Sequence, residues 1–157
     1  MSIVLARIDN RLLHGIVASQ WSPATEAARL MIINDNAANN EIIKNSMKLA
    51  KPVGMALSII SEETALANFQ QKKYGEQTIF LVVDNPAILV NLARHNVALP
   101  KVNIGGTASR TNKYILSNRA SATEDEFQCY RYLADHGSNV FIQYMLADRA
   151  VDFNTVK

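Results

Sequence analysis

The sequence lacks the residues on which several classes of protein depend. It has a single cysteine among 157 residues, which excludes an internal disulfide and a zinc site built on cysteines. No apolar run approaches the roughly 20 residues of a membrane span, and residues 79–83 form one of the longest runs. The 16 basic and 14 acidic residues leave a net charge of +2, without a cluster of Lys and Arg interleaved with aromatic residues. This balance predicts no binding to nucleic acid.

Motifs for common cofactors and for export are missing as well. No G-x-G-x-x-G follows a predicted strand and no G-x-x-x-x-G-K-[ST] occurs, so the fingerprints of nucleotide binding are absent. Met1 and Ser2 lead directly into apolar residues, without the basic segment of a signal peptide. The remaining composition, 48% apolar and 19% charged, is that of an ordinary folded protein. We therefore expect one domain over residues 1–157, in the cytoplasm, with neither a cofactor nor a metal.

Short β-branched runs alternate with amphipathic segments along the whole chain. Several runs are continuously apolar, which is typical of parallel strands covered on both faces. Asn85-Pro86 and the capping box from Thr123 to Glu126 each predict the start of a helix. The pattern predicts a doubly wound α/β fold with a mainly parallel central sheet of about six or seven strands and helices on both faces. The predicted strands are residues 2–8, 30–34, 55–60, 78–83, 102–104, 114–116 and 139–144.

In such a sheet, ligands and reacting groups gather beyond the carboxyl ends of the strands. Polar segments follow the predicted strands there, and the glycine pair Gly105-Gly106 is open to two interpretations: a tight turn that needs positive φ, or a contact with phosphate. The segments expected at this edge are Asp9 to Gly15, Asn34-Asp35-Asn36, Ser61, Asp84-Asn85 and Gly105-Gly106-Thr107.

The segment after the first strand carries the strongest chemical signal. His14 lies just ahead of a helix predicted from Val17 onward, where backbone N–H groups attract anions. Arg7 and Arg11 would add charge-assisted contacts to a phosphate there, and Gly15 leaves room for a second protein to approach. A neutral imidazole at this end of a helix is a nucleophile. The competing interpretation of a lone loop histidine is a capping or hydrogen-bonding role.

The other two histidines and the cysteine have structural explanations. His95 and His136 are each predicted in the last turn of a helix, where a cation meets the negative end of the dipole. Cys129 lies in the middle of the helix that follows the capping box, which favours a buried or half-buried structural thiol. His14 therefore differs from the other histidines in lying at the end of a helix that attracts anions.

Residues 7–15, Arg-Ile-Asp-Asn-Arg-Leu-Leu-His-Gly, resemble a known signature. It is the R-I-D-x-R-L-[IVL]-H-G motif of the EIIB components of the bacterial phosphoenolpyruvate-dependent sugar phosphotransferase system, mannose/fructose/sorbose class. The likeness continues in order along nearly the whole chain. It runs through Trp21, Asn34-Asp35 with Ala38-Asn39, Asn85-Pro86, Asn103 to Gly106, and Phe141 to Gln143.

The resemblance implies a cytoplasmic phosphotransferase that associates peripherally with the membrane subunits EIIC and EIID. It implies that His14 accepts a phosphoryl group from phosphorylated EIIA, as a pros-phosphohistidine, and passes it to a sugar held by those subunits. Arg11 then stabilises the phosphoryl group and Asp9 orients the loop. Apolar residues near the C-terminus are compatible with a homodimer. The further residues expected to contact phosphate or a partner are Arg7, Gly15, Asn34, Asp35, Gly105 and Gly106.

The chain departs from the family pattern at two places. Ile16 stands where family members commonly carry Gln, and Thr107-Ala108-Ser109 replaces a segment that often contains Met and an aromatic residue. Both departures concern loop contacts with partners and leave His14, Arg11 and Asp9 untouched.

Two alternative functions stay open at this point. One is a receiver-like signalling domain phosphorylated on aspartate, because Asp9, Asp35 and Asp84 follow predicted strands. A receiver, however, needs an acidic pair after its first strand and a Lys after its fifth, where this chain has Gly105-Gly106. The other alternative is a small-ligand-binding α/β domain without catalysis.

Overall fold

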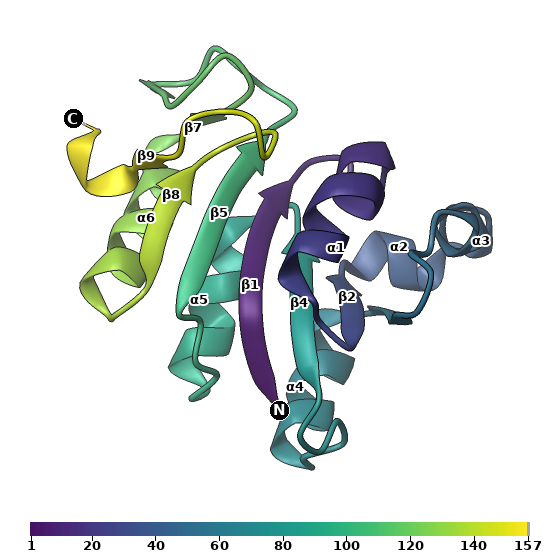
Figure 1. Cartoon of the computed structure of the whole chain (residues 1–157). Helices are drawn as coiled ribbons and strands as arrows, with labels where there is room; N and C mark the ends of the chain where they lie inside the picture. The colour runs from purple at the N-terminus through teal and green to yellow at the C-terminus, as the bar shows by residue number, and fades with distance from the viewer. Residues whose placement is uncertain (157) are drawn as a thin grey trace.

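The computed structural model describes residues 1–156, and Figure 1 shows a central twisted sheet between two layers of helices. The strands of this sheet lie in the order β3-β2-β4-β1-β5-β8-β9. All neighbouring pairs are parallel except β8 and β9. The bounds are β1 Ser2–Asp9, β2 Arg29–Ile33, β3 Ala56–Ile60, β4 Thr78–Val83, β5 Lys101–Gly106, β8 Asn139–Ile142 and β9 Val151–Asp152.

Helices cover both faces of the sheet, as the continuously apolar strands predict (Figure 1). On one face α4, α5 and α6 pack over β-strand residues such as Leu81, and on the other a helical segment after β1, together with α2 and α3, packs over residues such as Phe80. The bounds are α1 Ser22–Thr25, α2 Asp35–Asn39, α3 Glu41–Leu49, α4 Glu62–Gln70, α5 Pro86–Arg94 and α6 Glu124–Asp135, with a 3₁₀ turn at Phe153–Thr155.

Local capping explains where the helices begin. The side chain of Asn85 accepts a hydrogen bond from the Ala87 N–H, and Pro86 occupies the first position of α5. Thr123 and Glu126 form the predicted capping box at the start of α6. These side chains satisfy N–H groups that have no partner within the helix, so the predicted starts are confirmed.

The strand order places the end of β1 at a switch point. β1 lies between β4 and β5, and the chain leaves β1 toward β2 on one side but crosses from β4 to β5 on the other. The helical segment after β1 and α5 after β4 cover opposite faces of the sheet. A crevice at the carboxyl ends of the strands is expected at such a point. The fold therefore presents the loop after β1 at the edge where function was expected.

The structure differs from the prediction in three elements. The predicted strand at residues 139–144 ends at Ile142, and the chain then turns back to add β9 antiparallel to β8. The predicted strand at residues 114–116 pairs with β7, Ser121–Ala122, as the short strand β6, Tyr114–Ile115, outside the central sheet. The first helix begins at Gly15, and its Val17–Trp21 portion is a π-helix. Whether a strand of only two residues forms depends on where the folded chain places its partner strand, which short sequence patterns do not encode.

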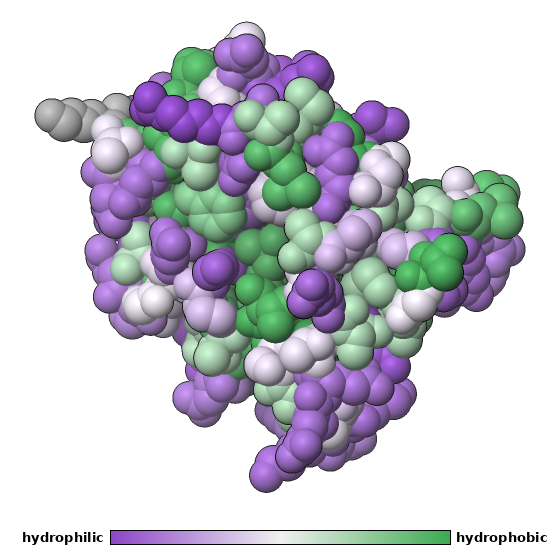
Figure 2. Space-filling model, viewed as in Figure 1, coloured by the Kyte–Doolittle hydropathy of each residue, from purple (hydrophilic) through white to green (hydrophobic). Residues whose placement is uncertain are grey.

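Two surface features complete the fold. None of the helices in residues 1–156 has the length and apolar character needed to cross a bilayer. Figure 2 shows apolar side chains on the protruding α3 region, where Ile42, Leu49 and Val53 are exposed. Near the C-terminus, by contrast, Phe153 is fully buried against Phe127 and Tyr130. That aromatic residue therefore serves the chain's own core.

Candidate functional site

A tight turn follows β1 and folds the chain back over the edge of the sheet. The Asn10 N–H donates to the Gly106 carbonyl at 3.0 Å, which ties the turn to the end of β5. The Arg11 N–H donates to Asp9 Oδ1 at 2.9 Å, and the Leu12 N–H donates to the Asp9 carbonyl at 3.1 Å. Leu12 adopts φ of 58°, a left-handed conformation that a branched residue rarely takes. The turn is thus held by Asp9 at its start.

His14 lies at the beginning of the helical segment that this turn introduces. Its carbonyl accepts the hydrogen bond from the Ala18 N–H at 2.9 Å, so its position just ahead of a helix is as predicted. Its Nε2 lies 2.8 Å from Asp9 Oδ2, and its side chain is 8% exposed. Nδ1 makes no hydrogen bond with residues 1–156. Because an ionised Asp9 can only accept, this contact is a hydrogen bond when Nε2 carries a hydrogen, and Nδ1 is then the ring nitrogen left without a partner in residues 1–156.

Arg7 lies behind Asp9 and is completely buried. Its Nε and Nη2 lie 3.1 and 3.0 Å from Asp9 Oδ2, and its Nη1 donates to Asn103 Oδ1 at 2.7 Å and to the Gln143 carbonyl at 3.3 Å. The guanidinium lies over the rings of Trp21 and Tyr144, with Cζ 4.8 and 5.7 Å from the ring centroids. The phosphate contact expected of Arg7 is therefore corrected, because its donors point into the protein.

The charges of this network favour an ionised Asp9. Burial alone would raise the pKa of Asp9, but the hydrogen bond with His14, the charge of Arg7 and the Arg11 N–H together bring that pKa below its ordinary value. Burial lowers the pKa of Arg7, and the adjacent Asp9 opposes this effect. A guanidinium starts from so high a pKa that it stays protonated near neutral pH. Arg7 and Asp9 therefore form a buried ion pair.

The glycine pair at the end of β5 makes room for this ion pair. A Cβ on Gly105 would lie 2.5 Å from Nη2 and 2.7 Å from Nε of Arg7, and closer still to Cζ. A Cβ on Gly106 would lie 3.3 Å from the Tyr144 ring and 3.4 Å from Asn10 Oδ1. Both glycines are buried and neither has a positive φ. The expectation of a turn with positive φ is corrected, because close approach of side chains explains the pair. A contact of this pair with phosphate stays a prediction.

Arg11 and Gly15 lie on the outer side of the site. Both are exposed, and the Arg11 side chain makes no hydrogen bond or ion pair within the described part of the chain. A Cβ on Gly15 would meet no atom within 4 Å. The structure thus leaves an exposed cation three residues before His14 and an open approach at Gly15, the residue after it.

Asn34 and Asp35 follow β2 and serve the connections of that strand. Asn34 Oδ1 accepts from the Ala37 N–H at 2.8 Å, and its amide donates to Asp84 at 3.0 Å. Asp35 Oδ1 accepts from the Glu62 N–H at 2.9 Å. β4 separates this end of the sheet from β1, and no hydrogen bond joins either residue to His14 in residues 1–156. Asn34 and Asp35 therefore lie at the carboxyl-end edge of the sheet, as predicted, but their side chains stabilise the starts of helices there.

The three aspartates on which the receiver hypothesis depended are not brought together. Asp9 pairs with Arg7 and His14, Asp35 binds the backbone of α4, and Asp84 binds Asn34. Within residues 1–156, no group of three or more His, Cys, Asp or Glu side chains is arranged to hold a metal ion. This arrangement contradicts a receiver-like acidic cluster.

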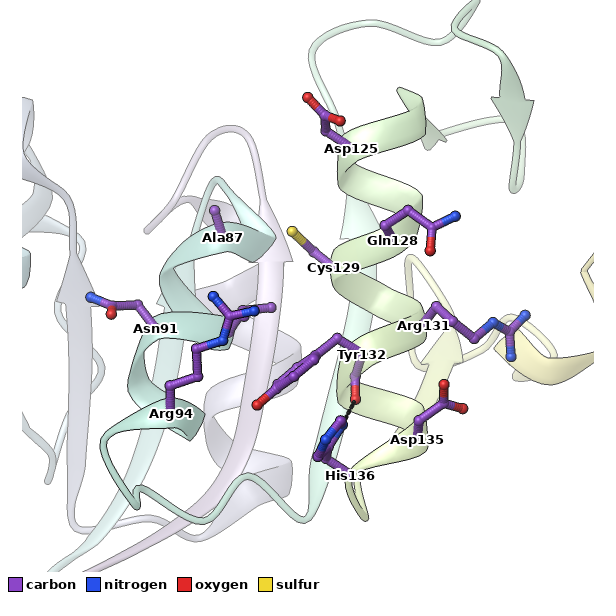
Figure 3. Close-up of a pocket in the computed structure, with 11 residues that line it drawn as sticks. Ala87, Asn91, Arg94, Asp125, Gln128, Cys129, Arg131, Tyr132, Asp135 and His136 are labelled. Atoms are coloured by element: carbon purple, nitrogen blue, oxygen red, sulfur yellow. Dashed lines mark hydrogen bonds between the residues drawn. The ribbon is translucent and has the colours of Figure 1, made fainter.

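The remaining histidines and the cysteine lie where the sequence predicts. His95 Nδ1 bonds to the Asn91 carbonyl at 2.8 Å at the end of α5. His136 Nδ1 bonds to the Tyr132 carbonyl at 2.7 Å at the end of α6, in the groove between α5 and α6 that Figure 3 shows. Cys129 lines the same groove half-buried, and burial raises the pKa of its thiol. These groups have structural roles, away from the loop after β1.

Sequence reasoning missed the residues that complete the network around Arg7. Asn103 and the Gln143 carbonyl accept its hydrogen bonds, and the Trp21 indole N–H donates to the Tyr144 carbonyl at 2.9 Å. Two signals could have found them. Trp21, Asn103 and Gln143 lie in the segments that resemble the family, and Arg7 itself lies inside a predicted strand whose two faces should be buried.

Known proteins are similar to this chain along nearly its whole length. A family described as PTS system sorbose subfamily IIB component matches residues 3–156. The chain is 34% identical over 152 residues to the PTS system sorbose-specific EIIB component of Klebsiella pneumoniae, covering 97% of this chain and 93% of that protein. It is 28% identical over 153 residues to the PTS system fructose-specific EIIB component of Bacillus subtilis, covering 98% and 94%.

Solved structures show the same fold. The IIBSor domain of the sorbose permease from Klebsiella pneumoniae superposes with a TM-score of 0.89 at 34% identity, covering 97% of this chain and 93% of that one. The manxB structure from Thermoanaerobacter tengcongensis gives a TM-score of 0.88 at 29% identity, covering 98% and 93%. With the family match over nearly all residues, these likenesses show that the chain belongs to the sorbose subfamily of IIB components of the sugar phosphotransferase system.

Proposed function

We propose that this IIB component carries a phosphoryl group on Nδ1 of His14, between phosphorylated EIIA and a sugar held by membrane subunits EIIC and EIID. One observation carries the proposal: Asp9 engages Nε2 of His14 at 2.8 Å, which leaves Nδ1 without a hydrogen-bond partner in residues 1–156. Nδ1 is the pros nitrogen of the imidazole. The expected product is therefore a pros-phosphohistidine.

The transfer step needs no metal and no nucleotide of this chain. The lone pair of His14 Nδ1 attacks the phosphorus atom of the EIIA phosphohistidine, and the phosphorus–nitrogen bond in EIIA breaks, returning its electron pair to that imidazole. The His14 ring keeps its Nε2 hydrogen and gains positive charge as the new bond forms. The Asp9 carboxylate, 2.8 Å from Nε2, offsets this charge in the transition state.

Arg11 is the cation suited to the phosphoryl oxygens. It is exposed, lies three residues before His14, and has no other partner in the described chain. A guanidinium offers planar paired donors that match phosphate. Backbone N–H groups of the first helical turn, which follows His14, add positive potential at the same place. Transfer in line between two histidines then depends on positioning and charge stabilisation.

The partner assignment is supported by a relative that joins two components. The chain aligns with 148 residues, or 46%, of the PTS system mannose-specific EIIAB component of Escherichia coli. The A component named there is the class of protein expected to donate the phosphoryl group. The exposed Gly15, with no atom near a Cβ placed on it, leaves the approach to His14 open for that protein. We expect the IIB component to work in the cytoplasm, peripherally associated with EIIC and EIID.

The proposal is tested by incubating the protein with the general phosphotransferase proteins, phosphoenolpyruvate and a panel of EIIA partners. Mass spectrometry should locate the adduct on His14, and His14→Ala should accept none. His95→Ala and His136→Ala are matched controls, because both histidines bond to helix-end carbonyls, and both variants should be phosphorylated normally.

The chemistry of the adduct separates the proposal from its alternatives. A phosphohistidine is lost in acid but survives base and hydroxylamine, whereas an acyl phosphate on aspartate is cleaved by hydroxylamine. A stable adduct on His14→Ala would refute the assignment. The absence of any adduct with every EIIA would favour a binding domain without catalysis.

A further inference from the structure

We infer that Arg7 is a positioning residue that sets the protonation state of His14 through Asp9, and that it does not contact the phosphoryl group itself. This inference rests on the proposed function and deepens it. Arg7 lies on the interior side of Asp9. Its Nε and Nη2 contact the same Asp9 oxygen, Oδ2, that lies next to Nε2 of His14. The three side chains thus form one line of contacts from the interior to the surface.

Burial makes the charge of Arg7 matter to His14. The Arg7 side chain is 0% exposed, the Asp9 side chain 1% and the His14 side chain 8%. Charges in such surroundings are poorly screened by water and interact strongly. The charge of Arg7 therefore changes the electrostatic interaction between Asp9 and the imidazole.

The charge balance of the network gives Arg7 an effect on the imidazole. Arg7 and Asp9 neutralise each other, so a proton added to His14 would leave one uncompensated positive charge in a nearly dry site. Among residues 1–156, the other groups that contact the pair include no carboxylate: they are the Arg11 N–H, the Asn103 amide, the Gln143 carbonyl, the Trp21 ring and the ring of Tyr144, whose phenol is titratable and acts on Arg7. Without Arg7, the imidazolium would become the counter-ion of Asp9, and the pair would bind a proton at higher pH.

The surroundings of Arg7 hold the guanidinium in this one place. Asn103 on β5 and the Gln143 carbonyl after β8 accept from Nη1, at 2.7 and 3.3 Å. Gly105 leaves the space that the guanidinium fills, and Trp21 lies over it. A lysine at position 7 would bring the charge but not the planar fork that reaches Asp9 and Asn103 at once. The site is therefore built around a guanidinium.

The test compares Arg7→Met and Arg7→Lys with the unmodified protein by nitrogen-15 NMR of the His14 ring during a pH titration. In the unmodified ring the hydrogen is expected on Nε2, the nitrogen that faces Asp9. In Arg7→Met, the titration midpoint of the ring should move up by about one pH unit or more. In Arg7→Lys, which keeps the charge, the midpoint should stay closer to that of the unmodified protein.

The rate of phosphoryl transfer gives a second measurement. Protonation of Nδ1 removes the nucleophile, so transfer from phosphorylated EIIA to Arg7→Met should be slower at pH values below the raised midpoint. The loss should approach about tenfold for each unit of midpoint shift at pH values well below both midpoints. The loss should be recovered as the pH is raised past the new midpoint. A purely structural role would lower the rate at every pH alike and leave the midpoint where it was.

A matched control removes an arginine elsewhere in the sheet. Arg29 on β2 is half-buried, binds Gln77 and Ser58 at 2.8 Å each, and lies over the Tyr74 ring, two strands away from β1. Arg29→Met should leave both the His14 titration and its transfer rate unchanged. If Arg7→Met does not fold, Arg7→Gln carries the same test, because its amide still donates to Asp9 but has no charge.

An unchanged His14 midpoint in folded Arg7→Met or Arg7→Gln would overturn the inference. The titration is read on unphosphorylated protein, so it gives its answer even if the proposed function fails. Absence of transfer to the unmodified protein would refute the proposed function, whereas normal transfer with an unmoved titration would refute only the role of Arg7.

Discussion

Gly105→Ala is the single substitution that the structure predicts most sharply. The added Cβ would lie 2.5 Å from Arg7 Nη2, whereas ordinary contact begins at 3.4 Å. We expect the guanidinium to retreat by roughly 1 Å, which would break the 3.1 Å hydrogen bond from Nε to Asp9 and lengthen the 3.0 Å ion-pair contact of Nη2 with the same carboxylate. The far end of an arginine usually moves easily. Here the side chain is fully buried and bonded to Asp9, Asn103 and the Gln143 carbonyl, so it has nowhere to go.

The cost follows from what the displacement breaks. Crowding a packed interior costs about 1–3 kcal/mol, and leaving a buried charge without its partner costs about 3–5 kcal/mol. We expect Gly105→Ala to lose about 3–5 kcal/mol of unfolding free energy, since the broken ion pair is the larger effect. With a urea dependence of about 1–3 kcal/mol per molar, the unfolding midpoint should fall by about 1 M or more.

Urea unfolding followed by circular dichroism measures this loss, and Gly15→Ala is its matched control. Gly15 begins a helix, lacks positive φ and has no atom within 4 Å of the new Cβ, so its substitution should change stability by no more than about 0.5 kcal/mol. If Gly105→Ala unfolded at the same urea concentration as Gly15→Ala, the glycine would not be making room for the guanidinium. The reasoning about the ion pair would then be refuted.

Three further substitutions test other parts of the structure. Arg11→Ala should slow transfer from phosphorylated EIIA by about 10²–10³-fold, and Arg11→Lys should recover only part of the rate. Quench-flow measures these rates, and a wild-type rate in Arg11→Ala would mean that Arg11 is only a surface charge. Because the fold holds the pKa of Asp9 below its ordinary value, the Asp9 charge stabilises the fold above about pH 4 and this contribution is lost as the pH falls through the folded pKa. The stability difference between the unmodified protein and Asp9→Asn should accordingly shrink in acid, and a constant difference in urea unfolding at each pH would contradict this. The Tyr130 hydroxyl is buried without a hydrogen-bond partner in residues 1–156, so Tyr130→Phe should stabilise the fold by up to about 1–3 kcal/mol and raise the thermal unfolding midpoint. A lower midpoint would show that the hydroxyl has a hydrogen-bond partner after all.

The sequence by itself determined the fold class and the position of His14. Strand periodicity and helix caps depend on residues that are neighbours in the chain, so continuously apolar runs and the Thr123–Glu126 capping box were sufficient for the parallel α/β architecture. The motif from Arg7 to Gly15 was sufficient for the family, because its residues are contiguous. The place of His14 ahead of a helix was local in the same sense.

Only the tertiary structure decided what the residues around His14 do. Arg7 and Arg11 are both arginines in one motif, but Arg7 lies within β1 and is buried while Arg11 lies in the turn and is exposed. The partners of Arg7, Asn103 and Gln143, lie 96 and 136 residues further along the chain and reach it only because β5 and β8 follow β1 in the sheet. The space left by Gly105 has the same origin. Contacts of this kind depend on strand order, which no local pattern encodes, and so a residue expected to bind phosphate is in fact the buried counter-ion of Asp9.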